Sequence, residues 1–174
     1  MNLLVAQDMD LDEAAELVNQ AYRSTAVPGW TSEVGLIDGP RTNRQSLAEM
    51  IANGASTLLL ARDGVSGRLS GCVALTPRRH GEWYLSMLAV GPQAQATGLG
   101  KSIMAGAEKF ARGAGAHTLK ISVINLRLPL IEWYERLGFA RTGQTEPFPY
   151  DDTNVGAPLR DDLVLVALTK SLTI

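Results

Sequence analysis

Residues 86–104 restrict the possible fold more than any other part of the sequence; they read SMLAVGPQAQATGLGKSIM. An apolar run ends at Gly91-Pro92, a short segment without acidic residues follows, and Gly98-Leu99-Gly100-Lys101 opens a segment with helical periodicity. This order predicts a strand, a loop and a helix. The two glycines have no side chains, the N–H groups of the first helical turn lack partners, and the helix dipole favours negative charge. The stretch therefore predicts a phosphate or pyrophosphate site.

The spacing of the glycines distinguishes three kinds of phosphate-binding loop. A Walker loop would end in Gly100-Lys101-Ser102, but Gln95 stands where its first glycine belongs. A dinucleotide fingerprint would need a third glycine at the position of Ile103. The pattern that fits is Gln/Arg-x-x-Gly-x-Gly at residues 95–100, preceded by Leu-Ala-Val-x-Pro at residues 88–92.

With these residues, the sequence resembles the GCN5-related N-acetyltransferase (GNAT) superfamily, in which a motif of this form binds the pyrophosphate of acetyl-coenzyme A. The ordinary structural alternative is a plain strand-to-helix turn. The resemblance implies that acetyl-coenzyme A is the cosubstrate and that the coenzyme contacts twelve residues. These are Leu88, Ala89, Val90, Gln95, Ala96, Thr97, Gly98, Leu99, Gly100, Lys101, Ser102 and Asn125.

The length and charge of the chain exclude several classes of protein. Its 174 residues are the size of one domain, which we expect to span residues 1–174. A net charge of -2 argues against a general nucleic-acid-binding protein, and no apolar run approaches a membrane span. Residues 1–6 lack the features of a signal peptide, and the single cysteine, Cys72, fits a reducing compartment. We expect a cytoplasmic protein, and a homodimer is compatible with the sequence.

Hydrophobic periodicity predicts an α+β fold with a mixed, mostly antiparallel sheet flanked by helices. The expected strands are residues 2–6, 57–61, 69–75, 82–90, 117–124, a strand after residue 139, and residues 163–169. The expected helices are residues 10–23, 43–52, 98–112 and a short helix that begins near Pro129. This order matches the acetyltransferase fold over nearly the whole chain.

A second block, residues 125–139, also resembles the family. It contains Asn125 and the run WYERLGF at residues 133–139, although Asn125 and Tyr134 are two positions further apart than in many members. The segment RLPLI at residues 127–131 resembles the helix start of a subgroup with this spacing. The resemblance implies that Tyr134 protonates the departing thiolate; the alternative is a tyrosine buried in the core on the Ile131 face.

The resemblance also implies how the strand at residues 82–90 is used. In the family, this strand diverges from its neighbour, pantetheine binds like an added strand, and a spare N–H near Leu88 points at the thioester oxygen. The sequence does not identify a single residue as the general base. Glu82, on this strand, and Glu33, in an earlier loop, are candidates that would act through water, and a solvated surface carboxylate is the ordinary alternative for each. Two histidines and one cysteine at no ligand spacing argue against a metal.

Two loops are the candidates for binding the acceptor. The first carries Trp30, Glu33 and Arg41, and the second carries Phe148 and Tyr150. Aromatic and acidic side chains suit a cationic amine, whereas Arg41 would suit a carboxylate on the acceptor. We therefore expect acetyl transfer to a primary amine of a small molecule or peptide by direct attack in a ternary complex. The alternative is a non-catalytic module that senses acyl-coenzyme A.

Overall fold

The computed structural model describes residues 2–26, 29–52, 54–152, 154 and 156–173. Its strands are β1 (Leu4–Val5), β2 (Ile37–Asp38), β3 (Thr57–Arg62), β4 (Leu69–Pro77), β5 (Glu82–Val90), β6 (Thr118–Ile124), β7 (Ala140–Pro147), β8 (Ala157–Pro158) and β9 (Val164–Ser171). Its α-helices are α1 (Leu11–Arg23), α2 (Arg44–Ala52), α3 (Leu99–Gly113) and α4 (Leu128–Arg136), and short 3-10 turns lie at Asp8–Asp10, Arg79–Gly81 and Pro92–Ala94. The predicted α+β architecture is confirmed.

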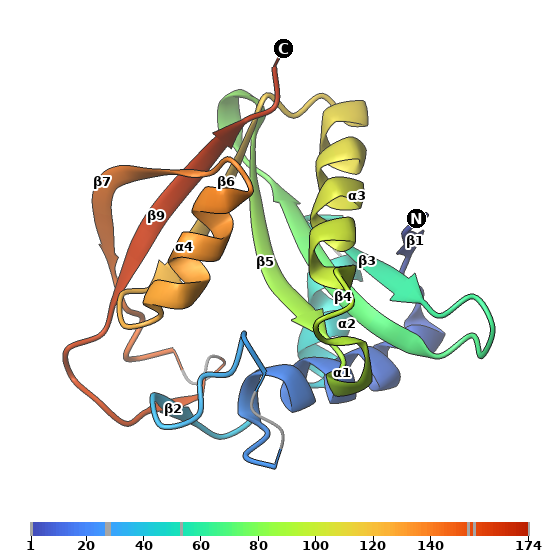
Figure 1. The fold of residues 1–174 in the computed structure, drawn as a ribbon, viewed down its shortest axis with the longest axis horizontal. Coiled ribbons are helices and arrows are strands. Elements are labelled where there is room, and N and C mark those ends of the chain that lie inside the picture. The colour runs from blue at the N-terminus through green and yellow to red at the C-terminus, as the bar shows by residue number, and fades with distance from the viewer. Residues whose placement is uncertain (1, 27–28, 53, 153, 155, 174) are drawn as a thin grey trace.

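Seven strands form one sheet in the order β1-β3-β4-β5-β6-β9-β7, and all neighbouring pairs are antiparallel except β5 with β6. The helices α3 and α4 cover one face, and α1 and α2 cover the other (Figure 1). Alternation along the strands produces this division: in β3, Leu59 packs toward α3 and Leu60 toward α1. None of the described helices is long and apolar enough to cross a membrane.

A β-bulge interrupts the central strand β5. Cys72 lies opposite Ala89 and Ala74 lies opposite Ser86, so Val73 alone faces the two residues between them, Met87 and Leu88. Met87 has a φ of 49°, an unusual conformation for a residue with a side chain. The extra residue shifts by one position the alternation of side chains between the two faces of the sheet. As a result, Leu85 and Leu88 both pack toward α3 although they are three positions apart.

The parallel pairing of β5 with β6 is short. It joins Glu82 with Thr118, Trp83 with Leu119 and Tyr84 with Lys120, and then ends. Figure 1 shows the two strands together at the end of the sheet near the carboxyl end of α3, and diverging toward the other end. The rest of β5, including the bulge, therefore has no ladder partner on its β6 side, as the resemblance implied.

The main elements lie where the sequence predicts them, within a few residues at their ends. The prediction omits the two-residue pair β2 and β8, in which Ile37 lies opposite Pro158 and Asp38 opposite Ala157. Such short segments, more than a hundred residues apart, have no periodicity of their own. They pack beside a small cluster that contains Ile37, Ile124, Phe148 and Leu163.

Gly71 in β4 allows α3 to lie close to the sheet, and Gly71→Ala should destabilise the fold. A Cβ at this position would lie 2.4 Å from Ile103 Cδ1 and 2.9 Å from the Ala89 carbonyl oxygen. We expect a loss of about 1 to 3 kcal/mol, as for other overpacked cores, measured by denaturant unfolding. Gly64→Ala in the β3–β4 turn is the control, because its Cβ would meet no atom within 4 Å. Equal stability of the two variants would contradict this packing.

Candidate active site

Two cavities adjoin where β5 leaves β6. The phosphate-loop cavity, about 540 Å³, lies between the start of α3 and α4 and is lined by residues including Gln95, Gly98, Gly100 and Lys101. The Tyr134 cavity, about 220 Å³, lies on the Leu88 side and contains Tyr134 in its wall. Arg127 and Leu130, at the start of α4, line both cavities.

The start of α3 has the geometry of an anion site. Gly98 precedes the helix with a φ of 81°, in the left-handed region that favours glycine. The first intrahelical hydrogen bond joins the Ser102 N–H to the Gly98 carbonyl oxygen at 3.1 Å, so the N–H groups of Leu99 to Lys101 have no such partner. Lys101 and Arg136 add positive charge to the wall. These residues fit a pyrophosphate group.

Four of the residues assigned to the coenzyme lie outside the walls of both cavities, and three of them belong to β5, the loop and α3. Ala89 is fully buried on the α1 side of the sheet, the Thr97 hydroxyl donates to the Ala94 carbonyl oxygen at 2.6 Å, and Ser102 is exposed on α3. The other loop residues, Gln95, Ala96 and Gly98 to Lys101, and Val90 of β5, line the phosphate-loop cavity. Leu88 lines the Tyr134 cavity.

Asn125 also lies apart from the two cavities. Its side-chain oxygen accepts the Val164 N–H at 3.1 Å, and its side-chain nitrogen donates to the Asp162 carbonyl oxygen at 3.3 Å. Both ends of the amide therefore hold the start of β9 in place. Asn125 therefore has a structural position at the start of β9, and its contact with the coenzyme stays a prediction.

Trp30 lines the phosphate-loop cavity, although the sequence analysis placed it with the acceptor. Its ring centroid is 4.5 Å from that of Trp133 on α4, and a Cβ at Gly100 would lie 3.0 Å from its ring. Trp30 lines the phosphate-loop cavity and does not line the Tyr134 cavity. Periodicity does not predict which way a side chain in a loop points, and this explains why the sequence analysis assigned Trp30 to the acceptor.

Tyr134 is held by ring contacts and not by its hydroxyl. It is only 6% exposed, and its ring lies 5.0 Å from that of Trp133 and 5.6 Å from that of Phe139. Among the described residues, none forms a hydrogen bond with the Tyr134 hydroxyl. Burial raises its pKa well above the usual value, so the phenol keeps its proton at neutral and moderately alkaline pH.

Tyr22, at the end of α1, was not identified from the sequence. Its hydroxyl donates to the Leu88 carbonyl oxygen at 3.1 Å, and its side chain lines the Tyr134 cavity. The bond ties α1 to the bulge of β5. The helical pattern does not distinguish Tyr22 from an ordinary packing residue, so no sequence signal was available for it.

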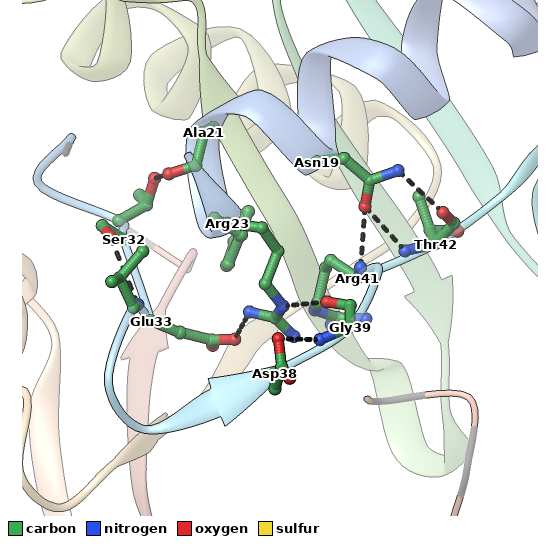
Figure 2. A network of polar contacts seen from close by, with 12 residues as sticks. Asn19, Ala21, Arg23, Ser32, Glu33, Asp38, Gly39, Arg41 and Thr42 are labelled. Atoms are coloured by element: carbon green, nitrogen blue, oxygen red, sulfur yellow. Dashed lines mark hydrogen bonds and ion pairs between the residues drawn. The ribbon is translucent and has the colours of Figure 1, made fainter. Parts of the chain in front are cut away.

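Glu33 lies in the Tyr134 cavity, where its carboxylate accepts a hydrogen bond from Arg23 (Figure 2). The side chains of Glu33 and Arg23 are 15% and 10% exposed, and Arg23 also donates to the Gly39 carbonyl oxygen at 2.8 Å. The pair therefore fastens the loop after α1. Glu82, the other base candidate, lines a neighbouring open groove with Arg78 and does not reach this cavity.

The two aromatic residues of the second candidate acceptor loop lie in different places. Phe148 is buried and lines the Tyr134 cavity. Tyr150 lies outside it: its hydroxyl accepts the Leu163 N–H at 2.8 Å, and its ring packs 5.1 Å from that of Phe148. Tyr150 therefore packs against Phe148 and does not line this cavity.

Arg41 lines the Tyr134 cavity, as the acceptor assignment requires. Its backbone N–H donates to Asn19 Oδ1 at 2.7 Å, and the same oxygen accepts the Thr42 N–H at 3.2 Å (Figure 2). Its guanidinium carbon lies 5.6 Å from the centre of the Tyr22 ring. Within the described ranges, no group of three or more His, Cys, Asp or Glu side chains is placed to hold a metal ion.

The diverging sheet and the anion site at the start of α3 define an acyltransferase architecture, and the comparisons agree. Residues 17–139 match the model of the acetyltransferase (GNAT) family, and the chain belongs to this family. No match was found among curated proteins. The fold is therefore identified by both the family model and the structure.

Solved structures with this fold have different acceptors. The ribosomal-protein-alanine N-acetyltransferase of Brucella melitensis has a TM-score of 0.71 and 20% identity, covering 98% of this chain and 99% of that one. The ribosomal-protein-S18-alanine N-acetyltransferase of Escherichia coli has a TM-score of 0.72 and 16% identity, covering 99% and 94%. Nourseothricin acetyltransferase has a TM-score of 0.58 and 25% identity, covering 70% and 68%.

Proposed function

We propose that this protein transfers the acetyl group of acetyl-coenzyme A to a primary amine by direct attack in a ternary complex. The observation that carries the proposal is the adjacency of the two cavities. One has an anion site at a helix start, the other has the Tyr134 phenol, and Arg127 and Leu130 form their common wall. Reactants bound in these cavities would meet beside the bulge of β5.

The phosphate-loop cavity would hold the coenzyme. The N–H groups of Leu99, Gly100 and Lys101 would face the pyrophosphate, and the Lys101 side chain would add a positive charge. Backbone groups of β5 that lack a β6 partner, from Leu85 to Val90, are available to pair with an extended pantetheine arm. When bound, acetyl-coenzyme A supplies the thioester that is cleaved.

The transfer replaces a carbon–sulfur bond with a carbon–nitrogen bond and moves two protons. The amine nitrogen bonds to the acetyl carbon, the carbon–sulfur bond breaks, and the sulfur leaves with the bonding electron pair. Tyr134 would donate its phenolic proton to that sulfur, and the proton lost by the amine would pass through water to Glu33 and from there back to the phenolate. A backbone N–H at the bulge would stabilise the charge that develops on the acetyl oxygen.

The environment of Tyr134 keeps the phenol protonated. A phenol of raised pKa is protonated before the reaction, and its free hydroxyl has no competing partner among the described residues. Glu33 is the carboxylate available in this cavity to receive the amine proton through water, although it is also bound to Arg23. The proposal therefore assigns Tyr134 as the general acid and Glu33 as the candidate base.

The direct test is binding and turnover with the wild-type protein. Coenzyme A should raise the melting temperature and ATP or NAD should not, because a ligand at 100 times its Kd adds about 2.7 kcal/mol of stability. A panel of amines with acetyl-coenzyme A should then release free thiol. Stabilisation by ATP alone would contradict the coenzyme site. Tight binding of coenzyme A with no amine acetylated would favour a sensor.

A further inference from the structure

The Tyr134 cavity contains two arginines that lack an acidic partner. Arg41 and Arg127 both line it, and neither forms an ion pair with any described residue. Four other arginines bind carboxylates: Arg44 with Asp8, Arg62 with Asp10, Arg141 with Glu135 and Arg160 with Asp162. Arg68, Arg78 and Arg79 also lack an ion pair with a described residue, so what distinguishes Arg41 and Arg127 is that both line this cavity.

Arg41 is held in position without an ion pair to any described residue. Asn19 clamps its backbone from α1, and the Tyr22 ring supports the guanidinium. These contacts leave the fork of N–H donors without a hydrogen bond to any described residue. A planar fork of this kind matches the two oxygens of a carboxylate.

Arg127 brings a second positive charge that is poorly compensated. Its Nη2 donates to the Trp30 carbonyl oxygen, while its Nη1 is buried and has no hydrogen-bond partner among the described residues. Burial lowers the pKa of this guanidinium, which means that its charged form is short of solvation. An anion nearby would compensate for that loss.

Glu33 offsets these charges only in part. It is the acidic residue in the wall of the Tyr134 cavity; it forms an ion pair with Arg23, and its charge raises the pKa of Arg127 against the larger, opposite effect of burial. The wall therefore carries two arginines and one acidic residue around a space of about 220 Å³. A volume below the range usual for drug-sized ligands suits a compact acceptor.

We propose that the acceptor is a small amine that also carries a carboxylate, such as an α-amino acid, and that Arg41 binds this carboxylate. Arg127 supplies the second positive charge. This inference rests on the proposed acetyl transfer and specifies its substrate class. Arg41 is the diagnostic residue, because it lines the Tyr134 cavity alone, whereas Arg127 also lines the phosphate-loop cavity.

The test compares amines that differ only at the carboxylate. Common L-amino acids, their primary amides and simple diamines are each supplied with acetyl-coenzyme A, and kcat/KM is measured by thiol release. We expect the best amino acid to exceed its own amide by at least about 10²-fold, because the amide leaves Arg41 without its ionic partner. Equal or faster turnover of the amides or diamines would overturn the inference but leave acetyl transfer intact.

Variants of Arg41 test whether this residue binds the carboxylate of the acceptor. Arg41→Gln should raise KM for the amino acid about 10- to 100-fold with the KM of acetyl-coenzyme A unchanged, and Arg41→Lys should recover part of the loss. Arg78→Gln is the matched control: Arg78 lies 5.6 Å from the Tyr84 ring, as Arg41 does from Tyr22, but it lines the neighbouring groove. A larger loss for Arg78→Gln than for Arg41→Gln would overturn the assignment to this cavity.

A binding measurement keeps the inference testable without turnover. Calorimetric titration of N-acetyl amino acids and their amides into the protein with coenzyme A reports on the acceptor cavity directly. Selective binding of the acids, abolished by Arg41→Gln, would support the carboxylate site even if no amine were acetylated. Absence of binding by the acids, together with absence of turnover, would overturn both proposals.

Discussion

Replacing Tyr134 by phenylalanine is expected to reduce kcat about 10²-fold while leaving the fold and the affinity for coenzyme A intact. The change removes the proton donor and keeps the ring that packs against Trp133 and Phe139. Since no described residue bonds to the hydroxyl, the free energy of unfolding should stay within about 0.5 kcal/mol of wild type. Turnover with the best amine and denaturant unfolding measure the two effects.

Tyr150→Phe is the matched control for this result. The Tyr150 hydroxyl accepts the Leu163 N–H, so its loss should cost about 1 kcal/mol of stability and leave turnover nearly unchanged. The opposite pattern, in which Tyr134→Phe lowers stability and keeps normal turnover, would remove Tyr134 from the mechanism. The raised pKa of Tyr134 further predicts that ionisation of this phenol produces no loss of kcat up to about pH 10.

Replacing Gly100 by aspartate is expected to raise the Kd for coenzyme A at least about 10²-fold. The new Cβ would lie 3.0 Å from the Trp30 ring, and the carboxylate would stand at a helix start that we assign to a pyrophosphate. A hundredfold change corresponds to about 2.8 kcal/mol, the size expected when a like charge and a steric conflict act together. Titration calorimetry with coenzyme A measures it.

Gly113→Asp is the control for introducing an aspartate into α3 away from the loop. Gly113 ends the same helix, and a Cβ there would meet no atom within 4 Å, so coenzyme affinity should be unaffected. Gly98→Asp should also weaken binding, with some strain from the φ of 81°. Unchanged affinity in folded Gly98→Asp and Gly100→Asp variants would show that the loop is a structural turn only.

The sequence predicted those parts of the molecule that local patterns determine. Alternating apolar residues placed the long strands, and the glycines at residues 98 and 100 placed the loop and the start of α3. The bulge at Met87 and Leu88 could not be located, because an extra strand residue leaves the apolar run SMLAV unbroken.

The residues of the Tyr134 cavity were harder to predict, because they come from distant segments. Tyr22 belongs to α1 and Arg127 to the start of α4, and each resembles an ordinary packing or surface residue in its own segment. Trp30 and Tyr150 were assigned to the acceptor because their loops carry aromatic residues. The direction in which each ring points depends on tertiary contacts with Trp133 and with the Leu163 backbone.

The short pairing of β5 with β6 divides the large sheet into two ribbons, β1-β3-β4-β5 and β6-β9-β7. Backbone hydrogen bonding joins these ribbons over only three residue pairs, which end at Tyr84 and Lys120. Beyond that point the two ribbons share no strand pairing in the part of the chain that the structure describes, and the halves of the molecule are connected by side chains, helices and the short β2–β8 pair. The cavities assigned to the two substrates open along this seam. The part of the sheet with the fewest backbone hydrogen bonds is therefore also the part that bound ligands would stabilise.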